Sequence, residues 1–483
     1  MVKQADVSVN PRFGLFTCLL LVAALLFGGG QGWLGDQLLA IPACGLGLWG
    51  GHVLLQQSKS GEAPSKLVWL FPGLLLGVPL LQLVPLPPGW FAALPGRAAL
   101  VADLHRAGVS LGWHPISVIP YETERVLWNA TVPAGLFLAT LALPPRQQRW
   151  LMFAALGFAL LSATLGFTQL FEGEEGDFYF YRDTNRETAI GFFANRNHLA
   201  ALLAGMLPVV AGMLTDRARF GHGIGDLGLW MLSLCCIVLV LGATSTQSRA
   251  GFLLLMVSLA FSVVGMVSRS KAAPDAPAGA GTWLKGAGVI AVLVVVQYTL
   301  MGLLARLDQD PLEDLRWTFA ERTLEAARPF AGTGAGFGTF PEGYLQLGET
   351  VADMPLFVNH THNDYLELWY EGGLIGVGAL ACLLVVLFWK LTQAWRAFHQ
   401  RSALVGISTG SADEQAHVDA AGLRLGAGLA LVLFALHSAV DYPLRTTALA
   451  SLAAVFAAIL LSPPARPSRT TTAPPPAPRT PLR

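Results

Sequence analysis

Charged residues are scarce in this chain. Of its 483 residues, 13% are charged and 53% are hydrophobic, whereas a soluble domain carries about 25% charged residues. The composition therefore excludes an ordinary soluble protein. Apolar runs of roughly 20 residues, the length that a helix needs to cross a bilayer, recur along nearly the whole sequence. We expect an all-α, polytopic membrane protein, because helices satisfy their own backbone hydrogen bonds in lipid.

Cysteine is scarce as well, and its positions exclude a disulfide framework in external loops. All five cysteines fall inside apolar runs, where oxidative pairing between loops is not available. They are Cys18, Cys44, Cys235, Cys236 and Cys382.

Lysine is missing from long parts of the chain, and this absence predicts how the chain is oriented in the membrane. All lysines fall on one side of the membrane if the N-terminus is cytoplasmic, and cytoplasmic loops are the ones that collect positive residues. We therefore place both termini in the cytoplasm and expect the segments near 87–126, 171–197 and 305–372 outside. The lysines are Lys3, Lys59, Lys66, Lys271, Lys285 and Lys390.

About twelve apolar stretches are predicted to span the membrane. Several are short or contain Gly and Pro, so that one pair is also compatible with a single broken helix. The predicted spans are 13–29, 37–55, 67–86, 127–143, 151–170, 198–215, 227–244, 250–267, 286–304, 373–390, 425–441 and 446–462.

These spans divide the chain into five regions. N-terminal spans and a first external loop occupy 1–126, and central spans occupy 127–304. A large external loop covers 305–372, and C-terminal spans cover 373–462. The remainder, 463–483, is rich in Pro and Thr and is predicted to be a disordered cytoplasmic tail.

The external loop 305–372 carries a pattern typical of ordered structure. Between Pro311 and Pro329, apolar residues recur at helical spacing with charged residues between them, which predicts an amphipathic helix outside the membrane. Gly332-Thr-Gly-Ala-Gly-Phe-Gly338 follows and allows the backbone to approach a neighbour closely. It is not a dinucleotide-binding fingerprint, because no strand precedes it.

Three arginines are candidates for binding phosphate. Arg249 lies at the outer mouth of a span, and Arg316 and Arg322 lie on the predicted external helix. A guanidinium offers a rigid fork of donors for two phosphate oxygens. Alternatively, Arg249 extends to the membrane interface, and the other two pair with acidic neighbours on a solvated helix.

Two histidines precede the span that begins near 373. His362 has an imidazole suited to accept a proton from a hydroxyl nucleophile. On an extended segment His360, His362 and Asp364 share a face, which leaves a metal site as an alternative.

Polar residues at two other outer boundaries complete the candidates. His437 and Asp441 are four residues apart and are expected to face each other on a helix, either as functional groups or as polar contacts between helices. Asn195 and Asn197 follow Gly191-Phe-Phe193 and either cap the next span or contact a ligand.

Five motifs in this order resemble the O-antigen ligase and polymerase family. The resemblance covers about residues 185–460. The motifs are Gly191-Phe-Phe-Ala-Asn-Arg-Asn-His198, Ser248-Arg-Ala-Gly251, Gly332-Thr-Gly-Ala-Gly336, His360-Thr-His-Asn-Asp-Tyr365 with Glu371-Gly-Gly-Leu-Ile-Gly376, and His437-Ser-Ala-Val-Asp441.

The resemblance implies a GT-C-like glycosyltransferase of the bacterial inner membrane that acts at the periplasmic face. It implies undecaprenyl-diphosphate-linked glycans as donors, a glycolipid, glycan or protein hydroxyl as acceptor, and no metal or other cofactor. Arg249 and Arg316 correspond to arginines that hold the donor diphosphate, with Arg322 as the alternative second arginine. His362 corresponds to the base that activates the acceptor, with His360 beside it. Supporting roles fall to Asn195, Arg196, Asn197, Asn363, Asp364, His437 and Asp441.

Other functions stay open at this point. A ligase, a polymerase and a protein O-oligosaccharyltransferase of the same family share these motifs. A transporter also has about twelve spans, interrupted helices and intramembrane His and Asp pairs. It would place its charges near the bilayer midplane, whereas the arginines and histidines here are expected at or beyond the outer surface.

Overall fold

The computed structural model describes residues 11–30, 33–59, 65–181, 184–216, 225–270, 311–345, 358–402 and 421–463. Within these ranges the chain is helical apart from one two-stranded sheet. The predicted span at 286–304 and nearly all of the predicted tail at 463–483 lie outside the described residues.

Helices occupy every predicted span that the structure describes. They are α1 (Pro11–Phe27), α2 (Trp33–Lys59), α3 (Leu70–Gln82, preceded by the 3-10 helix η1, Lys66–Trp69), α6 (Pro120–Ala142), α7 (Pro145–Glu172), α8 (Arg196–Thr215), α9 (Gly225–Ser245), α10 (Arg249–Ser270), α14 (Asp364–Ser402), α16 (Ala421–His437) and α17 (Thr447–Leu461).

Apolar helices of membrane-spanning character run through the molecule. Among the described residues, four stretches have the length and composition to cross a membrane by themselves, namely Asp36–Lys59, Pro145–Glu172, Arg196–Thr215 and Asp364–His399. Shorter apolar helices accompany them. The helical membrane protein is confirmed, and the number of twelve spans stays a prediction.

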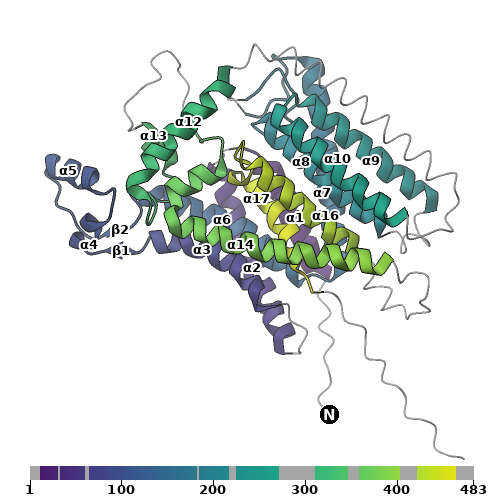
Figure 1. The fold of residues 1–483 in the computed structure, drawn as a ribbon, viewed down its shortest axis with the longest axis horizontal. Coiled ribbons are helices and arrows are strands. Elements are labelled where there is room, and N and C mark those ends of the chain that lie inside the picture. Colours follow the sequence, from purple (N-terminus) through teal and green to yellow (C-terminus); the bar gives the residue numbers. More distant parts are fainter. Residues whose placement is uncertain are drawn as a thin grey trace, which may run out of the picture.

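The bundle is organised around α8, which is the most buried of the long apolar helices. It packs against α9, α10 and α16, while α6 packs against α2, α3 and α17 (Figure 1). Small residues allow α8 and α16 to approach closely: a Cβ atom on Gly212 would lie 2.2 Å from the carbonyl oxygen of Gly422. Such contacts are typical of helix pairs in membranes.

We use the term site end for the end of the bundle where α1, α3, α7, α9 and α16 finish and α6, α8, α10, α14 and α17 begin. Hydrogen bonds between these helix ends define it: the amide of Ala448 donates to Gly28, and that of Ala189 donates to Ser245. At the opposite end, Asp216 accepts hydrogen bonds from the first amides of α16.

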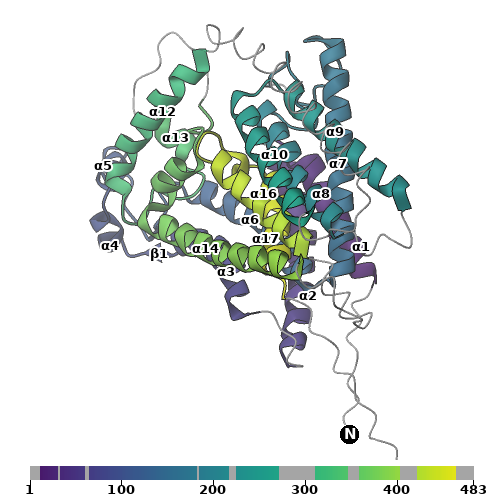
Figure 2. The ribbon, with the colours of Figure 1, turned by 45° about the vertical axis from the view of Figure 1, so that its right-hand side comes forward.

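Additional short elements gather at the site end. The first is a small lobe between α3 and α6, visible in both views of the ribbon (Figures 1 and 2), with β1 (Pro85–Leu86), α4 (Pro88–Ala93), α5 (Ala98–Arg106) and β2 (His114–Pro115), in which the strands pair antiparallel. The second contains α12 (Pro311–Ala327), the 3-10 helix η3 (Arg328–Phe330) and α13 (Phe340–Leu345). The helix predicted between Pro311 and Pro329 is thus confirmed.

Arg97 joins these two additions. Its side chain is fully buried, and it donates to the carbonyl oxygens of Ile116, at 2.6 Å, and Gly334, at 2.7 Å. The guanidinium also lies over the ring of Phe330. Burial lowers the pKa of Arg97 to about 10. The lobe between α3 and α6 therefore rests on the glycine-rich segment that follows α12.

The span predicted to begin near 373 starts earlier, and a kink divides it. Helix α14 begins at Asp364 and has non-helical geometry at Gly373, where φ is +55°. A Cβ atom there would lie 2.6 Å from the amide nitrogen of Gly334. Only glycine fits this contact without strain, so the glycine-rich segment packs directly on the kink.

Gly334 makes the closest approach, and it yields the first prediction. Its φ is +76°, and a Cβ atom would lie 2.0 Å from the carbonyl oxygen of Glu371. We expect Gly334→Ala to destabilise the protein by at least about 1–3 kcal/mol, the cost of an unfavourable backbone conformation. Gly332→Ala is the matched control, because no atom lies within 4 Å of the position where its Cβ would be. Thermal unfolding in detergent measures both, and equal melting temperatures would contradict the close packing.

Candidate active site

His362 has a backbone conformation that is rare for a residue with a side chain. Its φ is +57°, in the left-handed region that non-glycine residues adopt mostly at functional or constrained positions. The conformation turns the chain immediately before α14. The Nδ1 atom of His362 lies 3.2 Å from the Oδ1 atom of Asp441, and 29% of the His362 side chain is exposed.

Asp441 is the fully buried partner of two histidines. Besides His362, the Nε2 atom of His437 lies 3.6 Å from Asp441 Oδ2. The predicted helix through 441 is wrong in extent, because α16 ends at His437 and the chain turns there. The amide of Asp441 donates to the carbonyl of His437 at 2.9 Å, so the turn still brings the two side chains together as expected.

The environment of Asp441 keeps it ionised. Burial by itself raises the pKa of this carboxyl group, but the hydrogen bond to His362 and the charges of His198 and His437 lower it well below its usual range. Because hydrogen bonds to a carboxylate favour its ionised form, the contact with His362 favours a negative charge on Asp441.

Tyr442 forms an aromatic centre among three histidines. Its ring centroid lies 4.2 Å from that of His360, 5.0 Å from that of His362 and 4.9 Å from that of His198. Asn195 donates a hydrogen bond to the Tyr442 hydroxyl at 3.5 Å. Segments that begin α8, precede α14 and follow α16 therefore meet at one residue.

The shared face expected for His360, His362 and Asp364 is not formed. His362 turns the backbone and Asp364 already begins α14, so the segment is not extended and Asp364 does not join the two histidines. His360 Nδ1 lies 2.8 Å from Glu367 Oε1, whereas Asp364 accepts from Ser438 at 2.7 Å. Among the described residues, no group of three or more His, Cys, Asp and Glu side chains is arranged to hold a metal ion.

The predicted arginines occupy different positions relative to this centre. Arg249 begins α10 and follows Ser248, which donates to Asn197 Oδ1 at 2.6 Å at the start of α8. Arg316 acts on Tyr442: burial and the Asp441 charge raise the pKa of that hydroxyl, and the Arg316 charge opposes them.

Arg322 is associated with a different tyrosine. Burial raises the pKa of the Tyr344 hydroxyl, and the charge of Arg322 opposes this effect. Tyr344 belongs to a small second core with Phe319, Phe340 and Tyr370. Arg316 is therefore the α12 arginine that influences Tyr442, whereas Arg322 influences Tyr344 of the second core.

The remaining predicted residues shape the helix starts. Asn195 caps α8 by accepting from the amide of Asn197 at 2.8 Å, and the amide of Arg196 donates to Asn185 at 3.3 Å. Asn363 caps α14, because its side-chain oxygen accepts hydrogen bonds from the amides of Tyr365 and Leu366. Such caps satisfy amides that a helix leaves unpaired, and they fix where His362 stands.

Several residues of this centre were not identified from the sequence. His198 directly follows Asn197 in the sequence, and Tyr442 directly follows Asp441. This adjacency to predicted site residues could have identified both. Glu367, Glu371 and Arg445 form a buried ion-pair network behind His360. The sequence does not indicate a role for Arg445, because its acidic partners lie more than 70 residues away and belong to another motif.

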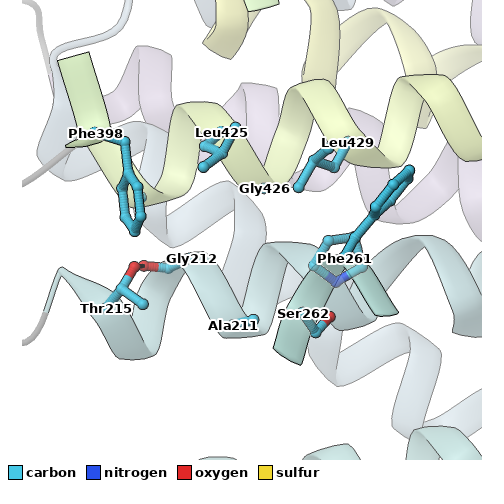
Figure 3. A pocket seen from close by; sticks show the side chains of 11 residues that line it. Ala211, Gly212, Thr215, Phe261, Ser262, Phe398, Leu425, Gly426 and Leu429 are labelled. Atoms are coloured by element: carbon cyan, nitrogen blue, oxygen red, sulfur yellow. Dashed lines mark hydrogen bonds between the residues drawn. The ribbon is translucent and has the colours of Figure 1, made fainter. Parts of the chain in front are cut away.

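A small cavity elsewhere in the bundle has no comparable chemistry. It has a volume of about 20 Å³, room for roughly one water molecule, and lies toward the opposite end between α8, α10, α14 and α16 (Figure 3). Its walls are mainly apolar or glycine, with the hydroxyls of Thr215 and Ser262. No titratable side chain lines it, so it is separate from the histidine centre.

Comparison with known proteins identifies one family. A family model described as O-antigen ligase matches residues 234–381, a segment that includes Arg249, Arg316, His360 and His362. Asp441 and Tyr442 lie beyond the match. No curated protein matches the chain. The match supports the resemblance drawn from the motifs and contains three of the five.

Proposed function

Since a family model described as O-antigen ligase matches residues 234–381, we propose that this chain acts as a member of that family and transfers an oligo- or polysaccharide from undecaprenyl diphosphate to an acceptor hydroxyl at the periplasmic face of the bacterial inner membrane. The observation that carries the proposal is the pair of His362 and buried Asp441, at the end of the bundle where Arg249 begins α10. Glycosyl transfer from a diphosphate requires an oriented base and cations that hold the diphosphate.

His362 is the general base of this reaction. The Asp441 carboxylate accepts from Nδ1 and so favours the tautomer whose Nε2 lone pair is free. The acceptor hydroxyl attacks the anomeric carbon, its proton passes to Nε2, and the bond from that carbon to the diphosphate oxygen breaks. The product is undecaprenyl diphosphate. Because this is a single displacement, the anomeric configuration is inverted.

Arg249 and Arg316 bind the donor diphosphate. A diphosphate is already a good leaving group, so stabilising the negative charge that grows on it matters more than protonating it. Guanidinium groups stay charged at any working pH and match two phosphate oxygens. The influence of Arg316 on Tyr442 supports its choice over Arg322.

The distribution of lysine supports a periplasmic location of the site end. Lys59 is the last residue of α2, and Lys66 begins η1, so both lie at the opposite end of helices that meet the site end. Lys390 lies in the second part of α14, far along the helix from His362. Since cytoplasmic loops collect lysine, the histidine centre belongs on the outer side.

The proposal is tested by His362→Ala in a strain that depends on the protein. We expect transfer to fall by about 10²–10⁴-fold, the contribution of a general base. Surface glycan analysed by gel electrophoresis then loses its ladder while lipid-linked polymer accumulates. A single retained rung would instead identify a polymerase, and a loss confined to glycosylated protein would identify a protein O-oligosaccharyltransferase.

The control for this experiment is His52→Ala. His52 is exposed on α2 and bonds to Gln56, so its loss leaves the ladder unchanged. A wild-type ladder in the His362→Ala strain, at matched protein level, would refute the role of His362 as base.

The two arginines of α12 are separated by a matched pair of substitutions. We expect Arg316→Ala to lower transfer by about 10²–10³-fold, as loss of one charge-stabilising donor does. Arg322→Ala should change it by about twofold at most, as for a residue outside the site. Initial rates with purified protein and a lipid-linked donor measure both. The reverse order of effects would assign the second phosphate contact to Arg322.

A further inference from the structure

Three acidic side chains lie on one face of the first part of α14. Asp364, Glu367 and Glu371 are spaced by three and four residues, which places them above one another on a helix. All three are buried. A row of buried carboxylates without a compensating cation is strongly unfavourable, so the row requires a positive partner.

Arg445 is that partner. It ends η4 (Pro443–Arg445), the short 3-10 helix between α16 and α17. Its Nε atom lies 3.5 Å from Asp364 Oδ1, its Nη1 atom lies 3.4 Å from Glu367 Oε1, and Nη1 also donates to Glu371 Oε2. Burial by itself lowers the pKa of Arg445, but the charges of Glu367 and Glu371 raise it above its usual value.

Two of these acids hold parts of the site. Glu367 contacts Nδ1 of His360 at 2.8 Å and accepts from the amide of Thr361 at 3.1 Å, so it fixes the segment that leads into His362. Glu371 accepts from the amide of Gly338 at 2.8 Å, so it fixes the glycine-rich segment after α12.

Gln82 links α3 to the glycine-rich segment and to α14 by hydrogen bonds. From the end of α3, its side chain donates to the carbonyl oxygens of Thr333 and Glu371 and accepts from the amide of Phe337. Gln82 therefore bonds the backbone of Glu371, while Arg445 bonds its carboxylate. Only the ion pairs continue to His360.

We propose that Arg445 is a positioning residue for glycosyl transfer, because it holds the Glu367 and His360 pair beside Tyr442 and thereby sets the location of His362. This role presupposes the function proposed above. Arg445 also neutralises acids that would otherwise repel the donor diphosphate from this end of the bundle. Its guanidinium contacts three carboxylates at once, which the single ammonium group of a lysine does not reproduce.

The test uses the purified full-length protein in liposomes with a lipid-linked glycan donor and an acceptor. We expect Arg445→Lys to lower kcat at least about 10-fold and Arg445→Gln at least about 100-fold, the range that loss of correct geometry costs. The KM for the donor should change by less than about threefold, because Arg249 and Arg316 remain. Arg125→Gln is the control: Arg125 pairs with Glu122 on α6 at 2.6 Å and should leave kcat within about twofold.

A double variant separates positioning from simple charge balance. In Arg445→Gln with Glu371→Gln, one positive and one negative charge are lost together, so the melting temperature should recover. The value of kcat should stay low, because the pair of Glu367 and His360 still lacks its support. Full recovery of kcat in the double variant would overturn the positioning role.

Folding and function are distinguished within the same experiment. If Arg445→Gln yields no folded protein, Glu367→Gln takes its place with the same expected loss of kcat, since it keeps the shape of the side chain and removes its charge. Folded variants with wild-type kcat would overturn the positioning role alone. A wild-type protein that transfers no glycan to any acceptor would instead refute the proposed function.

Discussion

The buried carboxylate of Asp441 is the constraint on which the site depends. A charge in the interior requires partners, and Asp441 obtains them from His362 and His437. These contacts join the segment before α14 to the turn after α16, which are 79 residues apart in sequence. The left-handed backbone at His362 is the local consequence, because the imidazole has to point back toward this carboxylate while Asp364 already begins a helix.

A second charged centre lies next to the first and has the opposite arrangement. Asp441 is one anion surrounded by histidines, whereas Arg445 is one cation surrounded by acids. Both belong to the short connection between α16 and α17, and both contact the start of α14. The connection thus fixes His362 and the segment that carries it, while Asn195 and Asn197 at the start of α8 lie on the other side of Tyr442.

The helices and several site residues were predictable from the sequence because their signals are local. Apolar runs predict helices wherever the bilayer imposes length and hydrophobicity, and His362, Asp441 and Arg249 stand in short motifs at the ends of such runs. The amphipathic spacing of α12 is equally local. These features need no knowledge of which helices are neighbours.

The remainder depends on contacts between distant segments. The kink at Gly373 exists because the backbone of Gly334 packs against it, and Arg445 gains its role from acids on another helix. His360, His362 and Asp364 would share a face only on an extended segment. The turn at His362 prevents this, and spacing in the sequence does not reveal the turn. The effect of Arg322 on Tyr344 of the second core likewise depends on contacts between distant segments.

The most direct test of glycosyl transfer by a base and two arginines is the stereochemistry of the product. Purified protein in liposomes would receive an undecaprenyl-diphosphate-linked glycan of known anomeric configuration together with an acceptor. Nuclear magnetic resonance of the new linkage would then show the configuration at the transferred carbon. Direct attack by the acceptor hydroxyl predicts the configuration opposite to that of the donor, and a retained configuration would contradict the account.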